Sequence, residues 1–184
     1  MNSIAWLAIF VWVGVPLFAL LMALMLWRWS RTLQGKSIVV IACVAILFAP
    51  MLVSSGVKAY YDRHVSELCT KDGGVKVYET VRLPAESFNQ WGQPNFYRPD
   101  QGEKALGTEY IFKQSISYQH QGSPSLHRYH VQVFSRASGK LLGESIGYSR
   151  GGGDLPGPWA PSSFSCPDKY GEIPLLTEIF IKSS

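Results

Sequence analysis

The pattern Gly-x-Ser-x-Gly occurs at Gly147–Gly151, and in serine hydrolases this pattern presents a nucleophilic serine. That chemistry needs a sharp strand-to-helix turn at the serine and a histidine base, which in that fold comes later in the chain. The residues after Gly151 are rich in glycine and proline and cannot begin the required helix, and no histidine follows Ser149. We therefore interpret the match as chance and predict no catalytic residue there.

Three histidines lie close together in the sequence. His127 and His130 have the H-x-x-H spacing that on a helix would let two imidazoles share one metal ion. His120 lies before the expected turn at 121–124, across from these two residues. The surrounding residues alternate as in a strand, where positions three apart point to opposite faces. We predict no metal site and no cofactor. A small periplasmic hydrolase or metal-dependent enzyme using one of these histidines remains an alternative.

Two cysteines flank most of the C-terminal region. Cys69 and Cys166 would pair in an oxidising compartment, and closing a loop of roughly 100 residues removes about 4–5 kcal/mol of unfolded-chain entropy. The alternative is a pair of free or metal-bound thiols, but neither cysteine has a second Cys or a His at ligand spacing. We predict a disulfide, and we interpret Cys43 as an inert apolar residue.

Aromatic residues gather in two proline-rich, nearly uncharged loops, Gln93–Pro99 and Leu155–Phe164. Aromatic and arginine side chains anchor protein interfaces, so the sequence favours a partner-binding role for these positions. Equally, the aromatic rings could fold back to cover the open side of a small sheet. The candidate partner-binding residues are Phe96, Tyr97, Arg98 and Trp159.

The first 57 residues contain no acidic side chain and hold two long apolar runs. A bilayer core about 30 Å thick needs roughly 20 apolar residues in a helix. We predict a transmembrane hairpin over residues 1–57, with helices at about 4–27 and 38–57 and a loop at 28–37. The second helix is expected to continue a few turns, to Leu68.

The loop 28–37 carries three basic residues, Arg28, Arg31 and Lys36, and such loops stay in the cytoplasm. The N-terminus and the C-terminal domain, residues 58–184, would then lie in the periplasm of a bacterium, with the hairpin in the inner membrane. Lys58 and Arg63 oppose this orientation, but Asp62 and Glu67 accompany them.

The basic excess does not indicate nucleic-acid binding. The chain has a net charge of +4, yet all 13 acidic residues follow residue 57, where they nearly cancel the basic residues of the same region. No basic stripe remains to follow a phosphate backbone, so we exclude nucleic acid as a partner.

Alternation of apolar and polar residues predicts an α+β domain with one antiparallel sheet of about five strands and one or two short helices. A short helix is expected at 85–91. The strands are expected at 75–83, 109–119, 126–135, 141–148 and 175–182.

The segment Cys69–Pro84, which reads CTKDGGVKVYETVRLP, resembles a family of uncharacterised small proteobacterial envelope proteins with a C-x-K-D-G-G-x-x-V-Y-E-T-V-x-L-P stretch. Ser138–Gly143 and Phe164–Pro167 also resemble that family. The resemblance implies a bacterial envelope protein and brings no activity and no site residues.

These observations together favour a non-catalytic protein that is anchored in the inner membrane and binds another envelope or membrane protein from the periplasm. A factor that excludes phage or plasmid DNA at the inner membrane is one alternative, and a purely structural membrane subunit is another. The expected partners are therefore the lipid bilayer and that other protein. The sequence identifies no small-molecule substrate.

Overall fold

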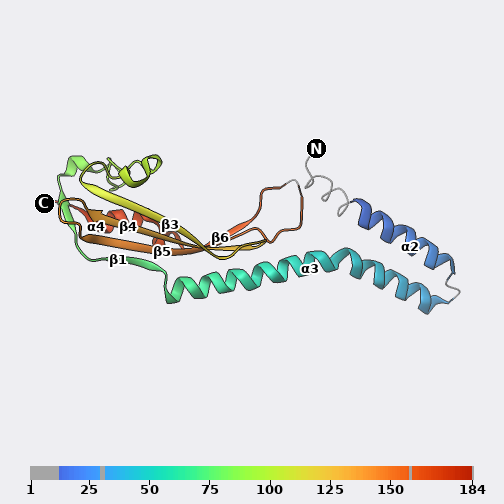
Figure 1. Cartoon of the computed structure of the whole chain (residues 1–184). Coiled ribbons are helices and arrows are strands. Elements are labelled where there is room, and N and C mark those ends of the chain that lie inside the picture. The colour runs from blue at the N-terminus through green and yellow to red at the C-terminus, as the bar shows by residue number, and fades with distance from the viewer. Residues whose placement is uncertain (1–12, 30–31, 158, 184) are drawn as a thin grey trace. The chain divides into compact units, whose positions relative to one another are not determined.

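The computed structural model describes residues 13–29, 32–157 and 159–183. These residues form two compact units. The helical unit contains the chain up to Tyr60 together with Gly152–Ser162, and the sheet unit contains Tyr61–Gly151 and the chain from Ser163 onward. Each unit is described separately below (Figure 1).

The helical unit contains α2, Val15–Trp29, and most of α3, Leu33–Lys71. Residues 4–12 of the first predicted helix lie outside the described residues. The predicted loop at 28–37 is too long, because α2 reaches Trp29 and α3 already begins at Leu33. Thr32 explains the early start: its Oγ1 accepts a hydrogen bond from Gly35 N at 3.2 Å, as an N-cap residue does.

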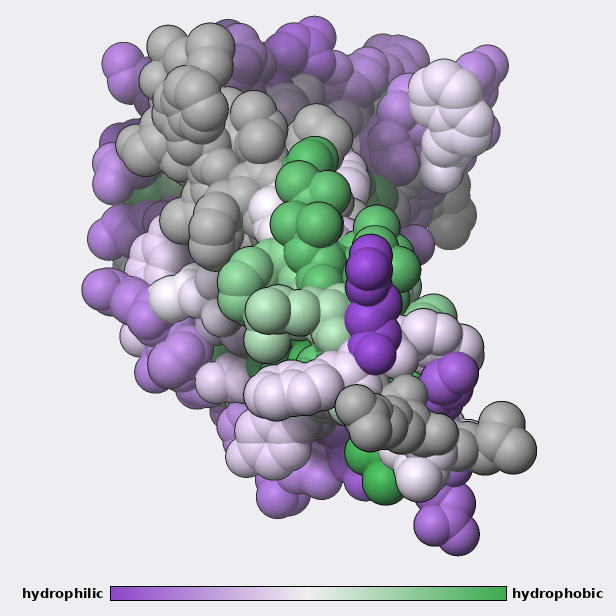
Figure 2. All heavy atoms as spheres, turned by 90° about the vertical axis from the view of Figure 1, so that its right-hand side faces the viewer, coloured by the Kyte–Doolittle hydropathy of each residue, from purple (hydrophilic) through white to green (hydrophobic). Residues whose placement is uncertain are grey.

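The helix α3 runs unbroken through Val57, as expected, and contains Pro50 in its interior. Among the described residues, α3 alone is long and apolar enough from Gln34 onward to cross a membrane, judged by length and composition, while α2 is apolar but shorter. The apolar side chains of α2 and of α3 up to Val57 are largely exposed, and they form the green area at the centre of Figure 2.

The sheet unit is built on an antiparallel sheet of five strands in the order β1-β5-β4-β3, with β6 pairing to β5. This arrangement confirms the predicted α+β class and the antiparallel sheet. The strands are β1 Gly74–Val77, β3 Tyr110–His120, β4 Ser125–Ser135, β5 Leu141–Gly151 and β6 Ser163–Ser165.

The predicted strand 75–83 is wrong as one element. It divides into β1 and β2, Val81–Leu83, because the backbone N–H groups of Tyr78 and Glu79 both donate to Leu142 O and the chain then leaves the main sheet. The predicted helix at 85–91 is reduced to a 3₁₀ turn, Ala85–Ser87. Two further 3₁₀ segments are η3, Pro99–Lys104, and η4, Asp168–Tyr170.

The predicted strand 175–182 is also wrong. Its first half is the helix α4, Glu172–Ile179, and only Phe180–Lys182 forms a strand, β7, which pairs in parallel with β2 in a separate sheet. The Ile- and Phe-rich composition favours a strand, but Leu175, Leu176 and Ile179 lie on one helical face and are fully buried.

Two apolar clusters lie on opposite faces of the main sheet, as the alternation along β4 requires. On the α4 face, α4 covers Val131 and Val133; on the α3 face, the last turns of α3 cover Leu126. The α4-face cluster also includes Tyr110, Phe112, Leu142, Leu175, Leu176, Ile179 and Phe180. The α3-face cluster also includes Val65, Cys69, Ile146 and Tyr148.

Candidate functional site

A covalent link joins the end of α3 to the segment after β6. Cys69 and Cys166 form a disulfide with their Cα atoms 5.7 Å apart, so the structure agrees with the predicted pairing. The bond closes a segment of 97 residues that contains most of the sheet. Cys43, in the apolar part of α3, is a free thiol.

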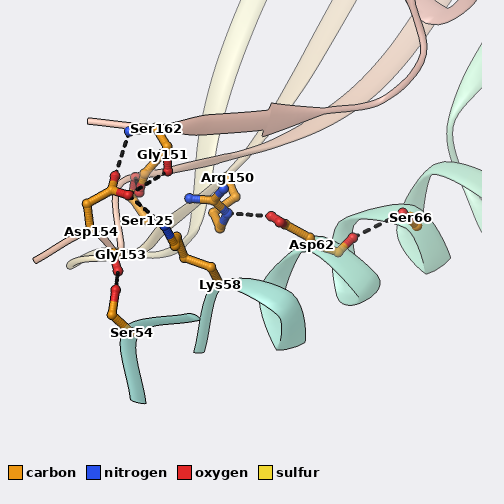
Figure 3. Close-up of polar contacts among 10 residues, drawn as sticks. All are labelled: Ser54, Lys58, Asp62, Ser66, Ser125, Arg150, Gly151, Gly153, Asp154 and Ser162. Carbon is orange, nitrogen blue, oxygen red and sulfur yellow. Dashed lines mark hydrogen bonds and ion pairs between the residues drawn. The ribbon is translucent and has the colours of Figure 1, made fainter. Parts of the chain in front are cut away.

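Two ion pairs hold α3 and the turn after it against the sheet. Arg150 is 3% exposed, and its Nε donates to Asp62 Oδ1 at 2.5 Å (Figure 3). Tyr148 lies two residues before Arg150 in β5, and its Oη donates to Asp72 Oδ2 at 2.5 Å. Arg128 Nε lies 3.3 Å from the same oxygen. The hydrogen bond from Tyr148, followed by the nearby guanidinium of Arg128, lowers the pKa of Asp72.

A third polar group lies where β1, β4 and β5 meet. Glu144 accepts a hydrogen bond from Tyr78 Oη at 2.7 Å, and its other carboxylate oxygen is 2.8 Å from His130 Nε2. The hydrogen bond from Tyr78, with a smaller contribution from His130, lowers the pKa of Glu144. Both oxygens are engaged, so this arrangement stabilises the sheet.

The three histidines do not come together. His130 contacts Glu144, His127 lies on the other face beside Ser125, and the His120 ring lies 5.7 Å from that of Tyr61. No group of three metal-binding side chains occurs among the described residues.

Ser149, the serine of the Gly-x-Ser-x-Gly match, lies inside β5 opposite His127, and the next described element after β5 is the strand β6 and not a helix. The same pattern also matches Gly143–Gly147, where Ser145 is buried and donates its Oγ to Tyr170 O. Sequence reasoning missed a different pair: Ser125 Oγ lies 2.9 Å from His127 Nε2. The Nδ1 atom of His127 is buried without a hydrogen-bond partner in the described part of the chain, so no carboxylate orients the ring.

The predicted surface residues separate into two groups. Phe96 packs edge-on to Phe180 at 5.5 Å between ring centroids, and Tyr97 packs on Phe112 at 5.7 Å. Both rings therefore cover the α4-face cluster, and burial together with the Glu172 carboxylate raises the pKa of Tyr97. A partner contact by these two residues stays a prediction.

Arg98 and Trp159 differ from those two rings. The guanidinium of Arg98 donates to two carbonyls of its own loop, Asn95 O and Tyr97 O, and so holds that loop together. Trp159 belongs to the helical unit and is 46% exposed.

An open surface remains on the α4 face, beyond the N-terminal end of α4. A cleft of about 740 Å³ lies between Gln114, Tyr129 and Val131 of the sheet and the segment Ser165–Pro174. Past the cleft, Ile116 and Tyr118 are 52% and 55% exposed, whereas Tyr110 and Phe112, earlier on the same face of β3, are buried.

The strand β3 is at the edge of the sheet, and it pairs only with β4 among the described strands. Arg136 N donates to Glu109 O, which places the hydrogen-bonded pairs of this ladder at odd-numbered β3 residues. The backbone N–H and C=O groups of Gln114, Ile116 and Tyr118 therefore point away from β4. The same three residues direct their side chains to the cleft side of the sheet.

Comparison of the chain with protein-family models, with curated proteins and with solved structures found no match to any of them. The candidate site lies within the sheet unit. It consists of the free edge of β3 from Lys113 to His120, with the adjoining cleft, and we call it the β3 edge.

Proposed function

We propose that this protein is anchored in a bacterial inner membrane by its N-terminal helices and binds another envelope protein without catalysing a reaction. The apolar, exposed side chains of the helical unit support the anchor, because such a surface is stable when it contacts lipid. The disulfide supports an oxidising compartment for the sheet unit, which in a bacterium is the periplasm.

The proposed orientation rests on three basic residues between the two apolar runs of the sequence, Arg28, Arg31 and Lys36, since basic segments of this kind are retained in the cytoplasm. Alkaline phosphatase fused after the last residue tests it, because that enzyme is active only where its own disulfides form. We expect an active fusion at the C-terminus and an inactive one at Lys36. The reverse result would exclude the periplasmic placement.

The observation that carries the binding function is the β3 edge. Its residues from Lys113 to His120 are all exposed; Lys113 and His120 are the basic residues among them, and none is acidic. Sheet proteins protect exposed edges with charges, proline or bulges; here Lys113 and a register irregularity between Tyr118 and His120 stand at the two ends of the edge, and the stretch Gln114–Tyr118 between them has none of these features. We propose that an extended segment of the partner adds to this edge as a further strand, with apolar side chains beside Ile116 and Tyr118.

A pair of variants at Gln114 tests the proposal. Gln114→Pro removes a backbone donor that points to the free edge, where proline is tolerated, whereas Gln114→Ala keeps the donor and removes the side chain. The chain is purified at native level in mild detergent, and the associated envelope proteins are quantified by mass spectrometry.

We expect one specific protein to be lost about tenfold with Gln114→Pro, because blocking strand addition removes more than one backbone hydrogen bond of about 1 kcal/mol, and to be retained with Gln114→Ala. Equal recovery with both variants, at equal thermal stability, would exclude strand addition.

Exclusion of incoming phage or plasmid DNA is a version of the same proposal in which the partner is a component of the DNA-entry machinery. Its readout is the plating or conjugation efficiency of cells that carry Gln114→Pro.

A hydrolase is the second candidate, favoured only by the Ser125–His127 pair. Reaction of Ser125 with a fluorophosphonate probe, abolished in Ser125→Ala and His127→Ala at unchanged stability, would support that candidate. Failure of the probe to label the folded chain would exclude it.

A further inference from the structure

The loop Gly152–Ser162, between β5 and β6, packs on α3 within the helical unit. Ser54 Oγ donates to Gly153 O at 2.7 Å, and Lys58 Nζ lies 2.8 Å from Asp154 Oδ1 (Figure 3). Ser54 and Lys58 are four residues apart, so they lie on the same side of the helix, one turn from each other. The loop is therefore fixed against one turn of α3.

That turn is the end of the apolar part of the helix. Ser54 lies inside the apolar run that ends at Val57, and Lys58 is the first charged residue after it. At a rise of 1.5 Å per residue, Ser54 is about 4–5 Å inside the end of the run. If the run crosses the bilayer, the loop residues bonded to Ser54 and Lys58 lie at the boundary between hydrocarbon and headgroups.

The composition of the loop suits that depth. Asp154 is its single ionisable residue, and the carboxylate is compensated by Lys58 and by hydrogen bonds from Ser162 N at 2.6 Å and Ser162 Oγ at 3.0 Å. The Lys58 ammonium, followed by the Ser162 N–H, lowers the pKa of Asp154 to about 2, so this carboxylate stays ionised. The ion pair with Asp154 also gives a structural reason for a lysine directly after the apolar run of α3.

The remaining loop residues, 155–161, read LPGPWAP and carry no charge. Prolines lack a backbone N–H, so three of them reduce the number of donors that would lose water at the interface. Trp159 is 46% exposed, and tryptophan is enriched at membrane–water interfaces because its ring is apolar and its indole N–H can still bond.

We propose that the loop Gly152–Ser162 is a membrane-interface anchor, in which Trp159 lies among the lipid headgroups of the leaflet from which α3 leaves the membrane. The occupant of this surface is the lipid bilayer, so Trp159 does not serve the protein partner proposed above. The inference rests on the proposed membrane hairpin, and it adds a third attachment between the chain and the bilayer. Through the ion pair and Ser54, the loop limits rotation and tilt of α3 at the membrane surface.

Fluorescence quenching by lipids measures the depth of the loop. In the full-length chain, Cys43→Ser leaves no free thiol, because Cys69 and Cys166 are bonded to each other. A single cysteine is then introduced by Ala160→Cys, which keeps Trp159, and labelled with an environment-sensitive dye. The protein is reconstituted in phosphatidylethanolamine–phosphatidylglycerol vesicles that contain lipids spin-labelled at the headgroup or deep in the acyl chain.

Two matched labels make the result interpretable. Leu47→Cys, on an exposed apolar position of α3, reports on the hairpin itself, and Ala137→Cys reports on an exposed turn of the sheet unit. We expect quenching of the Ala160→Cys label by the headgroup quencher at least about twofold above that of the Ala137→Cys label, and quenching of the Leu47→Cys label by the deep quencher. Adding Trp159→Ser should lower the quenching at position 160.

The possible failures are distinguishable. If the Leu47→Cys label is quenched and the Ala160→Cys label behaves like the Ala137→Cys label, the loop is not an interface anchor and the membrane hairpin stands. If the deep quencher does not reach the Leu47→Cys label, the membrane hairpin itself is excluded. If Trp159→Ser leaves quenching at position 160 unchanged, Trp159 is not the anchoring group and the inference is overturned.

Discussion

The two faces of the main sheet are held by different kinds of interaction. On the α3 face, a small apolar cluster is supplemented by the disulfide and by the ion pairs of Asp62 and Asp72. On the α4 face, a larger cluster is closed by α4 and by the rings of Phe96 and Tyr97, and its interior is apolar.

The difference relates to what each face does. The disulfide and the ion pairs fix the last turns of α3 at one position on the sheet, because covalent and charged contacts require particular partners whereas apolar packing does not. The α4 face needs only burial, which a helix of eight residues supplies for half of the sheet. The other half stays open at Ile116 and Tyr118, next to the free edge of β3.

The disulfide should have the largest effect on stability. Cys69→Ser removes a crosslink across 97 residues and is expected to lower the free energy of unfolding by about 4–5 kcal/mol, because the unfolded chain regains the entropy of an open loop. Urea denaturation measures this, with Cys43→Ser as the control, expected within about 0.5 kcal/mol of the parent. A loss below about 1 kcal/mol for Cys69→Ser would mean that the α3 face does not depend on the bond.

The apolar packing of the α4 face should come next. Leu176→Ala leaves a cavity at a fully buried position and is expected to cost about 3 kcal/mol. Ile116→Ala on the open half of the same face should change stability by less than about 0.5 kcal/mol. Thermal or urea unfolding of both variants measures this difference. A comparable loss of unfolding free energy in both variants would contradict an open surface at Ile116.

The Asp62–Arg150 ion pair should have an intermediate effect. Asp62→Asn removes the negative charge that Arg150 Nε contacts next to its buried guanidinium, and we expect a loss of about 1–3 kcal/mol. Glu67→Gln removes an exposed carboxylate from the same stretch of α3 and serves as the control. Equal stability of the two variants in urea would show that the pair only orients α3 and does not stabilise the domain.

The smallest effect is the pH dependence from Glu144. Its pKa is lower in the folded state than the ordinary 4.5, so the unfolded chain binds the proton more readily, and the stabilisation is complete above that value and is lost as the pH falls through the lowered pKa. We expect less than about 1 kcal/mol from this partly exposed pair.

Urea unfolding between neutral pH and acid should therefore show a shallower decline for Glu144→Gln than for the parent. Glu109→Gln, at an exposed position without these hydrogen bonds, is the matched control. A Glu144→Gln variant that declines as steeply as the parent would contradict the assignment.

Sequence patterns predicted the central meander closely because β3, β4 and β5 alternate over eleven residues each and are separated by turns with Gly or Pro. The pairing of Cys69 with Cys166 was also predictable, since these are the two cysteines outside the apolar runs. Patterns failed where a segment is short and its partner is distant. The stretch 175–182 has the composition of a strand, and only packing against Val133 and Phe112 selects a helix for its first half.

The β3 edge could not be predicted for the same reason. Ile116 and Tyr118 continue the alternation that begins with Tyr110 and Phe112, and nothing in the strand itself indicates that α4 covers only the first two. The Ser125–His127 pair was likewise hidden, because neither residue type nor spacing distinguishes it from ordinary strand residues. The number and order of strands at an edge depend on long-range pairing, which single-sequence patterns do not encode.

Four features follow from the amino-acid sequence alone: the two apolar runs, the basic segment between them, the alternation of the strands and the two cysteines that pair. Each of these depends on residues near one another in sequence or on cysteine count, so no other part of the fold is needed to infer them. Tertiary structure alone decided that α4 is helical, that Phe96 and Tyr97 serve as a cover, that β3 is left at an edge, and that the loop Gly152–Ser162 packs on α3. Those outcomes depend on which distant surfaces bury each other, and that choice is made by the whole domain at once.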